Sequence, residues 1–280
     1  MYDVLIDALL DSLKLLPFLF AVYVILELIE SRHKNEYNLN GRWAPVVGAG
    51  AGLLPQCGFS VMATNMYSAG RISVGTLIAV YLATSDEAIP VLLAHPDKIA
   101  DLAVLLAVKF VFASCVGLAT DAIFKNVKSG GKSAICGCEG EREENMSKLG
   151  RFVLHPALHS LKIFAFILIV NVLLGTAIFY IGEENLESLA RVRTLQPLLA
   201  AVIGLIPNCA SSVLITELYA NGALSWGALA AGLSVNAGVG TVVLFRVNRN
   251  TRQNFAIVGG TFAAAVTLGF VSDLIISLFR

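Results

Sequence analysis

Charged residues are scarce in this sequence, and their scarcity sets the class of protein. Asp, Glu, Lys and Arg make up 14% of the 280 residues, against about 25% in a typical soluble domain. Apolar residues reach 56%, and the mean hydropathy is +0.75. The 20 basic and 20 acidic residues cancel, so no excess of positive charge predicts a nucleic-acid partner. The composition predicts an integral membrane protein that lies in a lipid bilayer.

Histidines are few, and the motifs of ATP-driven or catalytic proteins are missing. The four histidines, at 33, 95, 155 and 159, lie near predicted loops, which argues against H-E-x-x-H chemistry inside a membrane helix. No G-x-x-x-x-G-K-[ST] motif occurs. The N-terminal residues show neither the basic segment nor the cleavage site of a signal peptide. The sequence therefore predicts no enzyme and no cofactor, with a membrane enzyme as the weaker alternative.

Apolar residues collect in blocks close to the ~20 residues with which a helix spans a bilayer. Six blocks are continuous: 4–30, 71–94, 98–124, 155–181, 223–246 and 254–279. Two more, 43–69 and 195–221, are interrupted by Pro55 and Pro207, and proline breaks a helix because it lacks an N–H donor. Segment 125–152 is rich in Gly, Lys and Glu and is typical of a flexible loop.

The second half of the sequence repeats the first. A shift of 152 residues superimposes many Gly, Pro, Cys, Tyr and Asp residues without gaps. The matched pairs include Gly52 and Gly204, Pro55 and Pro207, Cys57 and Cys209, Tyr67 and Tyr219, Gly70 and Gly222, and Asp121 and Asp273. We therefore predict a first transmembrane repeat over 1–124, a linker over 125–152 and a second repeat over 153–280. Broken helices at matching positions of two repeats are a feature of transporters.

The basic residues predict how the repeats lie in the membrane. If both broken blocks are re-entrant hairpins, most basic residues share one side, which the positive-inside rule makes cytoplasmic. This set comprises Arg32, Lys34, Arg42, Arg71, the basic residues of 125–151, Arg246, Arg249 and Arg252. The sequence thus predicts an all-α, multi-pass protein of the plasma (inner) membrane. Each repeat has three full helices and one hairpin, about ten helical segments in all. The repeats are inverted, both termini lie outside, and the linker is cytoplasmic.

The two hairpin tips are the first candidate site. They read Pro-Gln-Cys-Gly and Pro-Asn-Cys-Ala, and inversion brings them together near the middle of the membrane. A thiolate binds soft metals and trivalent arsenic, whereas a thiol only packs, and both readings stay open here. The neighbouring amides could coordinate an ion or cap a half-helix. The candidate residues are Gln56, Cys57, Ser60, Asn208, Cys209 and Ser212.

Carboxylates inside the apolar blocks form a second candidate site. Asp86 and Glu87 lie within block 71–94, where charged residues are costly and mark ion pathways, unless they belong to a solvated mouth. Thr84 and its counterpart Asn236 are neutral candidate ligands. Glu217 in the second hairpin is a candidate proton carrier or ligand, or emerges at the foot of the hairpin. Separately, Lys109 lies deep in block 98–124 and could pair with an acidic residue, which the sequence does not identify.

The linker contains Cys136 and Cys138, separated by one residue. Cys-x-Cys binds soft metals, but one pair supplies at most half of a metal site. Two readings stay open. The pair belongs to a metal-acquiring or sensing element, or the segment is a plain cytosolic linker. A disulfide is not expected on the cytosolic side.

Two segments carry a family resemblance. "GLLPQCGFSVMATNMYSAG" at 52–70 and "LATSDEAIP" at 82–90 resemble a predicted ten-helix heavy-metal exporter family, whose members are called arsenic efflux proteins or manganese transporters. They are more distantly similar to organoarsenical permeases that carry Pro-x-Cys-Ser-Cys-Gly. The chain departs from that permease pattern, because each tip has one cysteine and the second copy reads "SVNAGVG" where the first reads "ATSDEAI".

Together these observations predict a secondary transporter. Its expected partners are a metal or metalloid ion, most of all a divalent ion such as manganese, and protons as the exchanged ion. An arsenite or organoarsenical permease and a channel stay open as alternatives. A homodimer stays open as the assembly.

Overall fold

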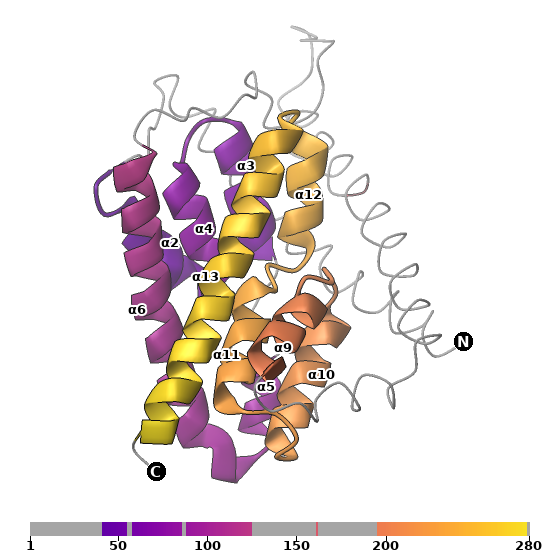
Figure 1. Cartoon of the computed structure of the whole chain (residues 1–280). Helices are drawn as coiled ribbons and strands as arrows, with labels where there is room; N and C mark the ends of the chain where they lie inside the picture. The colour runs from indigo at the N-terminus through magenta and orange to yellow at the C-terminus, as the bar shows by residue number, and fades with distance from the viewer. Residues whose placement is uncertain (1–40, 55–57, 86–87, 125–160, 162–194, 279–280) are drawn as a thin grey trace, which may run out of the picture.

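The computed structural model describes residues 41–54, 58–85, 88–124, 161 and 195–278. Within these residues the regular elements are all helices (Figure 1). Three predicted segments lie outside the described residues: the helix over 4–30, the whole linker over 125–152, and all but one residue of the helix over 155–181.

Four described segments are long and apolar enough to cross a membrane. They are Val74–Leu93, Pro96–Ile123, Trp226–Val247 and Thr251–Leu278. These segments coincide with four of the predicted apolar blocks, so the prediction of a helical, multi-pass membrane protein is confirmed. Pro96–Ile123 contains the short helix η1 (Pro96–Lys98) and α6 (Ile99–Ile123), and α13 is Thr251–Leu278.

Two of the four spans are interrupted, which the sequence did not predict. The first consists of α4 (Val74–Ala83) and α5 (Ala88–Leu93), with the backbone extended at Thr84, where ψ is 132°. The second consists of α11 (Trp226–Val235) and α12 (Val239–Val247). Between α11 and α12, Gly238 has a φ of +55°, a conformation that a residue with a side chain adopts only at a cost.

The two blocks predicted to be broken each contain a pair of short helices. Block 43–69 forms α2 (Ala44–Gly52) and α3 (Gly58–Ser68), and block 195–221 forms α9 (Gln196–Gly204) and α10 (Cys209–Ala220). Each pair ends in a turn at a glycine with positive φ, 71° at Gly70 and 76° at Gly222. The next helix runs back along the pair, so Thr64 of α3 meets Tyr81 of α4.

Each repeat contains the same set of hydrogen bonds between an aspartate and the start of the facing helix, which we call the clamp. In the first, the Asp121 carboxylate accepts hydrogen bonds from Ser73 Oγ at 2.5 Å and from the Gly75 N–H at 2.8 Å. The matching bonds join Asp273 to Ser225 at 2.6 Å and to Gly227 at 2.8 Å. An added Cβ at Gly75 or at Gly227 would lie 2.2 Å from a carbonyl oxygen of the facing helix. Glycine therefore allows α4 to approach α6, and α11 to approach α13, closely enough for the clamp to form.

Helices of one repeat pack on interrupted spans of the other. Ser60 of α3 lies against Gly240 at the start of α12, and Ser68 Oγ donates to the Val247 carbonyl at 3.2 Å near its end. The helices α3 and α12 therefore run side by side in the same direction. In the other half of Figure 1, α10 packs on α5, and Leu92 and Ile215 share a buried cluster.

Candidate functional site

The interruption between α11 and α12 is tied to the link between α9 and α10. Asn236 is 7% exposed and follows the last turn of α11. Its Nδ2 donates to Ser211 Oγ at 3.0 Å and to the Asn208 carbonyl at 3.4 Å, while its Oδ1 accepts the Gly238 N–H at 2.9 Å. Two predicted site residues, Asn208 and Asn236, are thus brought together, and Asn236 fixes the turn at Gly238.

Ser60 belongs to a buried network at the start of α12. Thr64 Oγ1 donates to the Ser60 carbonyl at 2.6 Å and lies 2.6 Å from Tyr81 Oη. Tyr81 Oη donates to the Gly240 carbonyl at 3.0 Å. The first repeat therefore approaches the interrupted span of the second through hydroxyl groups and through close packing of Ser60 on a glycine.

The interruption between α4 and α5 faces a buried lysine. Lys109 lies in the middle of α6 and is 0% exposed. Its ammonium donates to the Thr84 carbonyl, to Ser85 Oγ at 2.7 Å and to the Leu233 carbonyl at 3.0 Å. Thr84 and Leu233 lie at the ends of α4 and α11, where backbone carbonyls carry partial negative charge. The Lys109 ammonium therefore bridges the two interrupted spans.

The depth of Lys109 in its apolar block was predictable from the sequence, but its place between the two interrupted spans was not. The available signal was a single basic residue in the middle of an apolar block. Among the described residues its acceptors are mainly backbone carbonyls, and these cannot be recognised from residue types because every residue has one.

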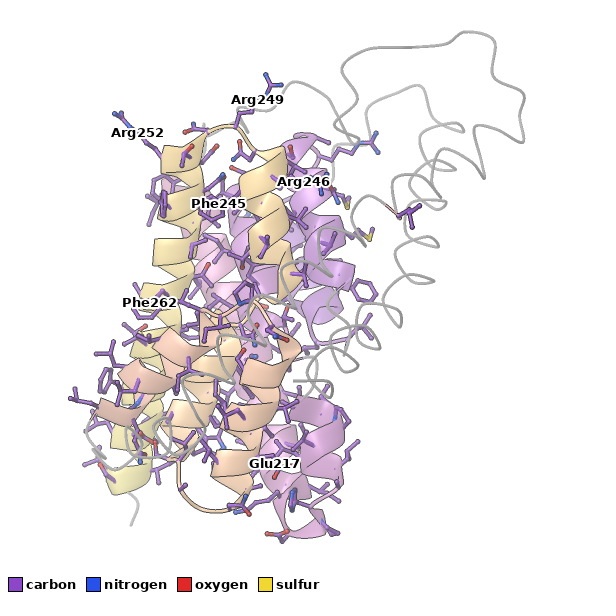
Figure 2. The ribbon with its side chains drawn as sticks, turned by 90° about the vertical axis from the view of Figure 1, so that its right-hand side faces the viewer. Glu217, Phe245, Arg246, Arg249, Arg252 and Phe262 are labelled. Atoms are coloured by element: carbon purple, nitrogen blue, oxygen red, sulfur yellow. The ribbon has the colours of Figure 1, made fainter. Side chains whose placement is uncertain are left out.

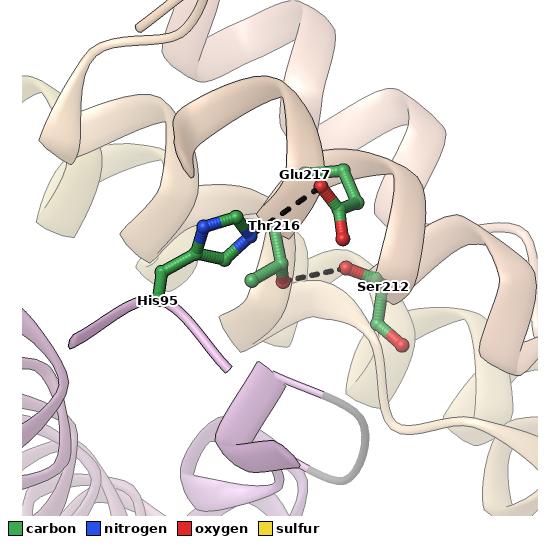
Figure 3. A network of polar contacts seen from close by, with 4 residues as sticks. All are labelled: His95, Ser212, Thr216 and Glu217. Atoms are coloured by element: carbon green, nitrogen blue, oxygen red, sulfur yellow. Dashed lines mark hydrogen bonds and ion pairs between the residues drawn. The ribbon is translucent and has the colours of Figure 1, made fainter. Parts of the chain in front are cut away.

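Glu217 lies away from the Asn208–Asn236 contact, toward one end of the bundle. Its carboxylate is 3.7 Å from His95 Nε2, and the two side chains are 45% and 35% exposed. Figure 3 shows this pair beside Thr216, whose Oγ1 donates to the Ser212 carbonyl at 2.7 Å. Figure 2 shows Glu217 at the opposite end of the molecule from Arg246, Arg249 and Arg252. The pair joins α10 to the link between α5 and α6.

Several predicted site residues lie outside the described residues. These are Gln56, Cys57, Asp86, Glu87, Cys136 and Cys138. Cys209 is the first residue of α10, but its side chain is likewise outside the description. In the part of the chain that the structure describes, no three His, Cys, Asp or Glu side chains gather as a metal-binding group.

The spans and their polar interruptions define a multi-pass helical membrane protein. Comparison with known families adds a narrower assignment. Residues 1–179 match the ArsP_2 family, described as "Putative, 10TM heavy-metal exporter". This match covers more than half of the sequence, so the chain belongs to that family, and the predicted resemblance is confirmed. No curated protein and no solved structure matches the chain.

Proposed function

We propose that this protein is a secondary transporter that exports a divalent metal ion such as manganese in exchange for protons. The observation that carries the proposal is the pair of interrupted spans, whose polar interruptions are buried at Thr84, Ser85 and Asn236. Exposed backbone groups inside a membrane are tolerated only where protein or a wet cavity surrounds them. In transporters such interruptions form the binding site.

The packing supports an inverted arrangement of the two repeats. Helix α4 runs back along α3, and α3 runs parallel to α12. The α4–α5 span therefore runs opposite to the α11–α12 span, and this relation is expected if the second repeat is inverted. The two short-helix pairs would then enter the membrane as hairpins from opposite sides. The end that carries Arg246, Arg249 and Arg252 would be cytoplasmic.

In this proposal the two repeats contribute different ligands. Asp86 and Glu87 directly follow Ser85 in the chain and supply the negative charge that a divalent cation requires. Thr84 and Asn236, at the ends of α4 and α11, supply neutral oxygens. The hairpin residues extend this set. They are Gln56, Cys57, Ser60, Asn208, Cys209 and Ser212. Glu217, beside His95, lies on the outer side of the path.

Transport by the purified protein in liposomes tests the proposal. Mn²⁺, Zn²⁺, Cd²⁺, Co²⁺ and arsenite are offered one at a time, with and without a pH gradient. The expected result is saturable Mn²⁺ flux that a pH gradient drives. Flux that does not saturate and ignores the gradient indicates a channel, and flux of arsenite alone indicates a metalloid permease. Either result contradicts the proposal.

A further inference from the structure

Tyr67 of α3 has a buried hydroxyl whose hydrogen-bonding capacity is unused. The side chain is 1% exposed, and its Oη finds no hydrogen-bond partner among the described residues. Leaving a buried hydroxyl unpaired is costly, and a bound water molecule is a common way to satisfy such a group. The matching tyrosine of the second repeat has no such need, because Tyr219 Oη donates to the Asp101 carboxylate at 2.7 Å.

Two more buried hydroxyls belong to the same part of the bundle. Tyr67 follows Thr64 by three residues in α3, so both lie on one face of this helix, and Tyr67 shares a buried cluster with Tyr81 of α4. Thr64 Oγ1 and Tyr81 Oη are 2.6 Å apart, and either can donate to the other. Thr64 can instead donate to the Ser60 carbonyl at 2.6 Å, and Tyr81 to the Gly240 carbonyl at 3.0 Å. These two hydroxyl hydrogens can therefore change acceptors without any movement of the backbone.

The three hydroxyls of Thr64, Tyr67 and Tyr81, which we call the hydroxyl row, lie between the interrupted span of the first repeat and one end of the bundle. Tyr81 is in the last turn of α4, three residues before the extended backbone at Thr84. Tyr67 is in the last turn of α3, and Gly70, three residues further on, is exposed. This is the end where α12 stops, because the residue after Tyr67 donates to the last carbonyl of α12. In the proposed arrangement that end is cytoplasmic.

The second repeat has no matching row. Shifted by 152 residues, the three positions become Thr216, Tyr219 and Leu233. A leucine stands where Tyr81 has its hydroxyl, so the polar connection toward the interruption is missing there. The helices around the row are common to both repeats, whereas the row is not. A requirement of the shared fold therefore does not explain it.

We propose that a water molecule bound at Tyr67 completes the hydroxyl row, and that the row carries a proton between the interrupted span and the cytoplasmic side. A hydroxyl oxygen can accept one hydrogen bond while it donates another. A proton that bonds to Tyr81 Oη releases that group's own proton to Thr64 Oγ1, and the water and Tyr67 Oη repeat the exchange. One O–H bond forms and one breaks at each oxygen, so no group is consumed. The inference rests on the proposed proton exchange and adds the route.

Two assays on the full-length protein in liposomes separate proton movement from metal movement. In the first, a pH gradient drives Mn²⁺ uptake. In the second, ⁵⁴Mn²⁺ outside exchanges with unlabelled Mn²⁺ inside at equal pH, which requires no net movement of protons. Tyr67→Phe and Tyr81→Phe each remove one hydroxyl of the row at nearly constant shape. Tyr219→Phe is the matched control, because it removes the hydroxyl that corresponds to Tyr67 in the second repeat.

Tyr67→Phe and Tyr81→Phe should slow the gradient-driven uptake by about tenfold or more, because a positioned proton carrier is lost. Exchange at equal pH should stay close to that of the wild type, and Tyr219→Phe should match the wild type in both assays. Full gradient-driven uptake in both row variants overturns the inference. Equal losses in the two assays overturn it as well, because they indicate a purely structural role.

The bound water is measured without any transport. X-ray irradiation of the purified protein in detergent converts water to hydroxyl radicals, and mass spectrometry locates the side chains that these radicals oxidise. Tyr67 should be oxidised although it is 1% exposed, whereas the buried Leu77, 0% exposed, should not. An unmodified Tyr67 overturns the inference whatever the transport assays show. An oxidised Tyr67 in a wild type that exchanges no Mn²⁺ supports the bound water and contradicts only the proposed function.

Discussion

The two repeats share one frame and differ at its centre. The clamps of Asp121 and Asp273 agree within 0.1 Å in their paired hydrogen bonds, and both interrupted spans break at matching residues. In sequence, the first repeat has Asp86, Glu87 and Lys109 at positions where the second has Gly238, Val239 and Thr261. The two copies of a duplicated sequence can therefore keep the same helix contacts while only the first has charged residues at these three positions.

The largest expected effect comes from the charges at the first interruption. Asp86→Asn and Glu87→Gln should each reduce metal flux to background, because an amide keeps the size but neither carries negative charge nor accepts an exchanged proton. Flux of the wild type should depend on pH. The measurement is Mn²⁺ uptake in liposomes at equal protein load. Asp97→Asn is the control, since Asp97 is an exposed residue of η1. Wild-type flux in both amide variants would contradict the proposal that the carboxylates of the first repeat bind the transported ion.

Lys109→Met should destabilise the protein more than any change at the matching Thr261. The ammonium is buried and joins both interrupted spans, and hydrogen bonds to charged groups contribute ~1.5–3 kcal/mol each. We expect a loss of about 3 kcal/mol in the free energy of unfolding in detergent. Lys98→Met is the control, because Lys98 is partly exposed beside Asp101 and should cost under about 1 kcal/mol. Equal losses at the two lysines would mean that the bridge contributes little.

The clamps should behave alike in the two repeats. Asp121→Asn and Asp273→Asn each replace one accepting oxygen by a donor, so the contact with the serine hydroxyl and the negative charge are lost. Each change should lower the free energy of unfolding by about 1–2 kcal/mol, and the two losses should agree within about 0.5 kcal/mol. Denaturant unfolding of both variants measures this. A clearly larger loss of unfolding free energy for one variant would show that the two aspartate clamps do not contribute equally to stability.

The smallest effect is expected at the end of the bundle. Glu217 matches Asn65 of the first repeat, whose Nδ2 donates to the Val61 carbonyl at 3.0 Å. Glu217→Asn makes the repeats alike at this position and removes the partly exposed pair with His95. The stability should change by less than about 1 kcal/mol. If flux nevertheless falls strongly while the unfolding free energy holds, Glu217 belongs to the ion path.

The sequence predicted the scaffold better than the site. The 152-residue shift paired Asp121 with Asp273, which make the same hydrogen bonds, and Gly70 with Gly222, which both have positive φ. Hydropathy could not reveal the interruptions at Thr84 and Gly238, because short polar residues and glycine hardly change the mean of an apolar block. The turn at Gly238 also depends on Asn236, and Asn236 is oriented by Ser211, which is distant in sequence.

The packing of α3 on α12 has a consequence for synthesis of the chain. Ser68 and Val247 are 179 residues apart and share a hydrogen bond, so α3 cannot reach its neighbour until α12 has left the ribosome. Contacts of such long sequence separation form late, and until then a polar, glycine-containing helix must remain in the insertion machinery or among lipids. Expression of the first half alone should therefore yield a protein that is degraded, and co-expression of the second half should rescue it.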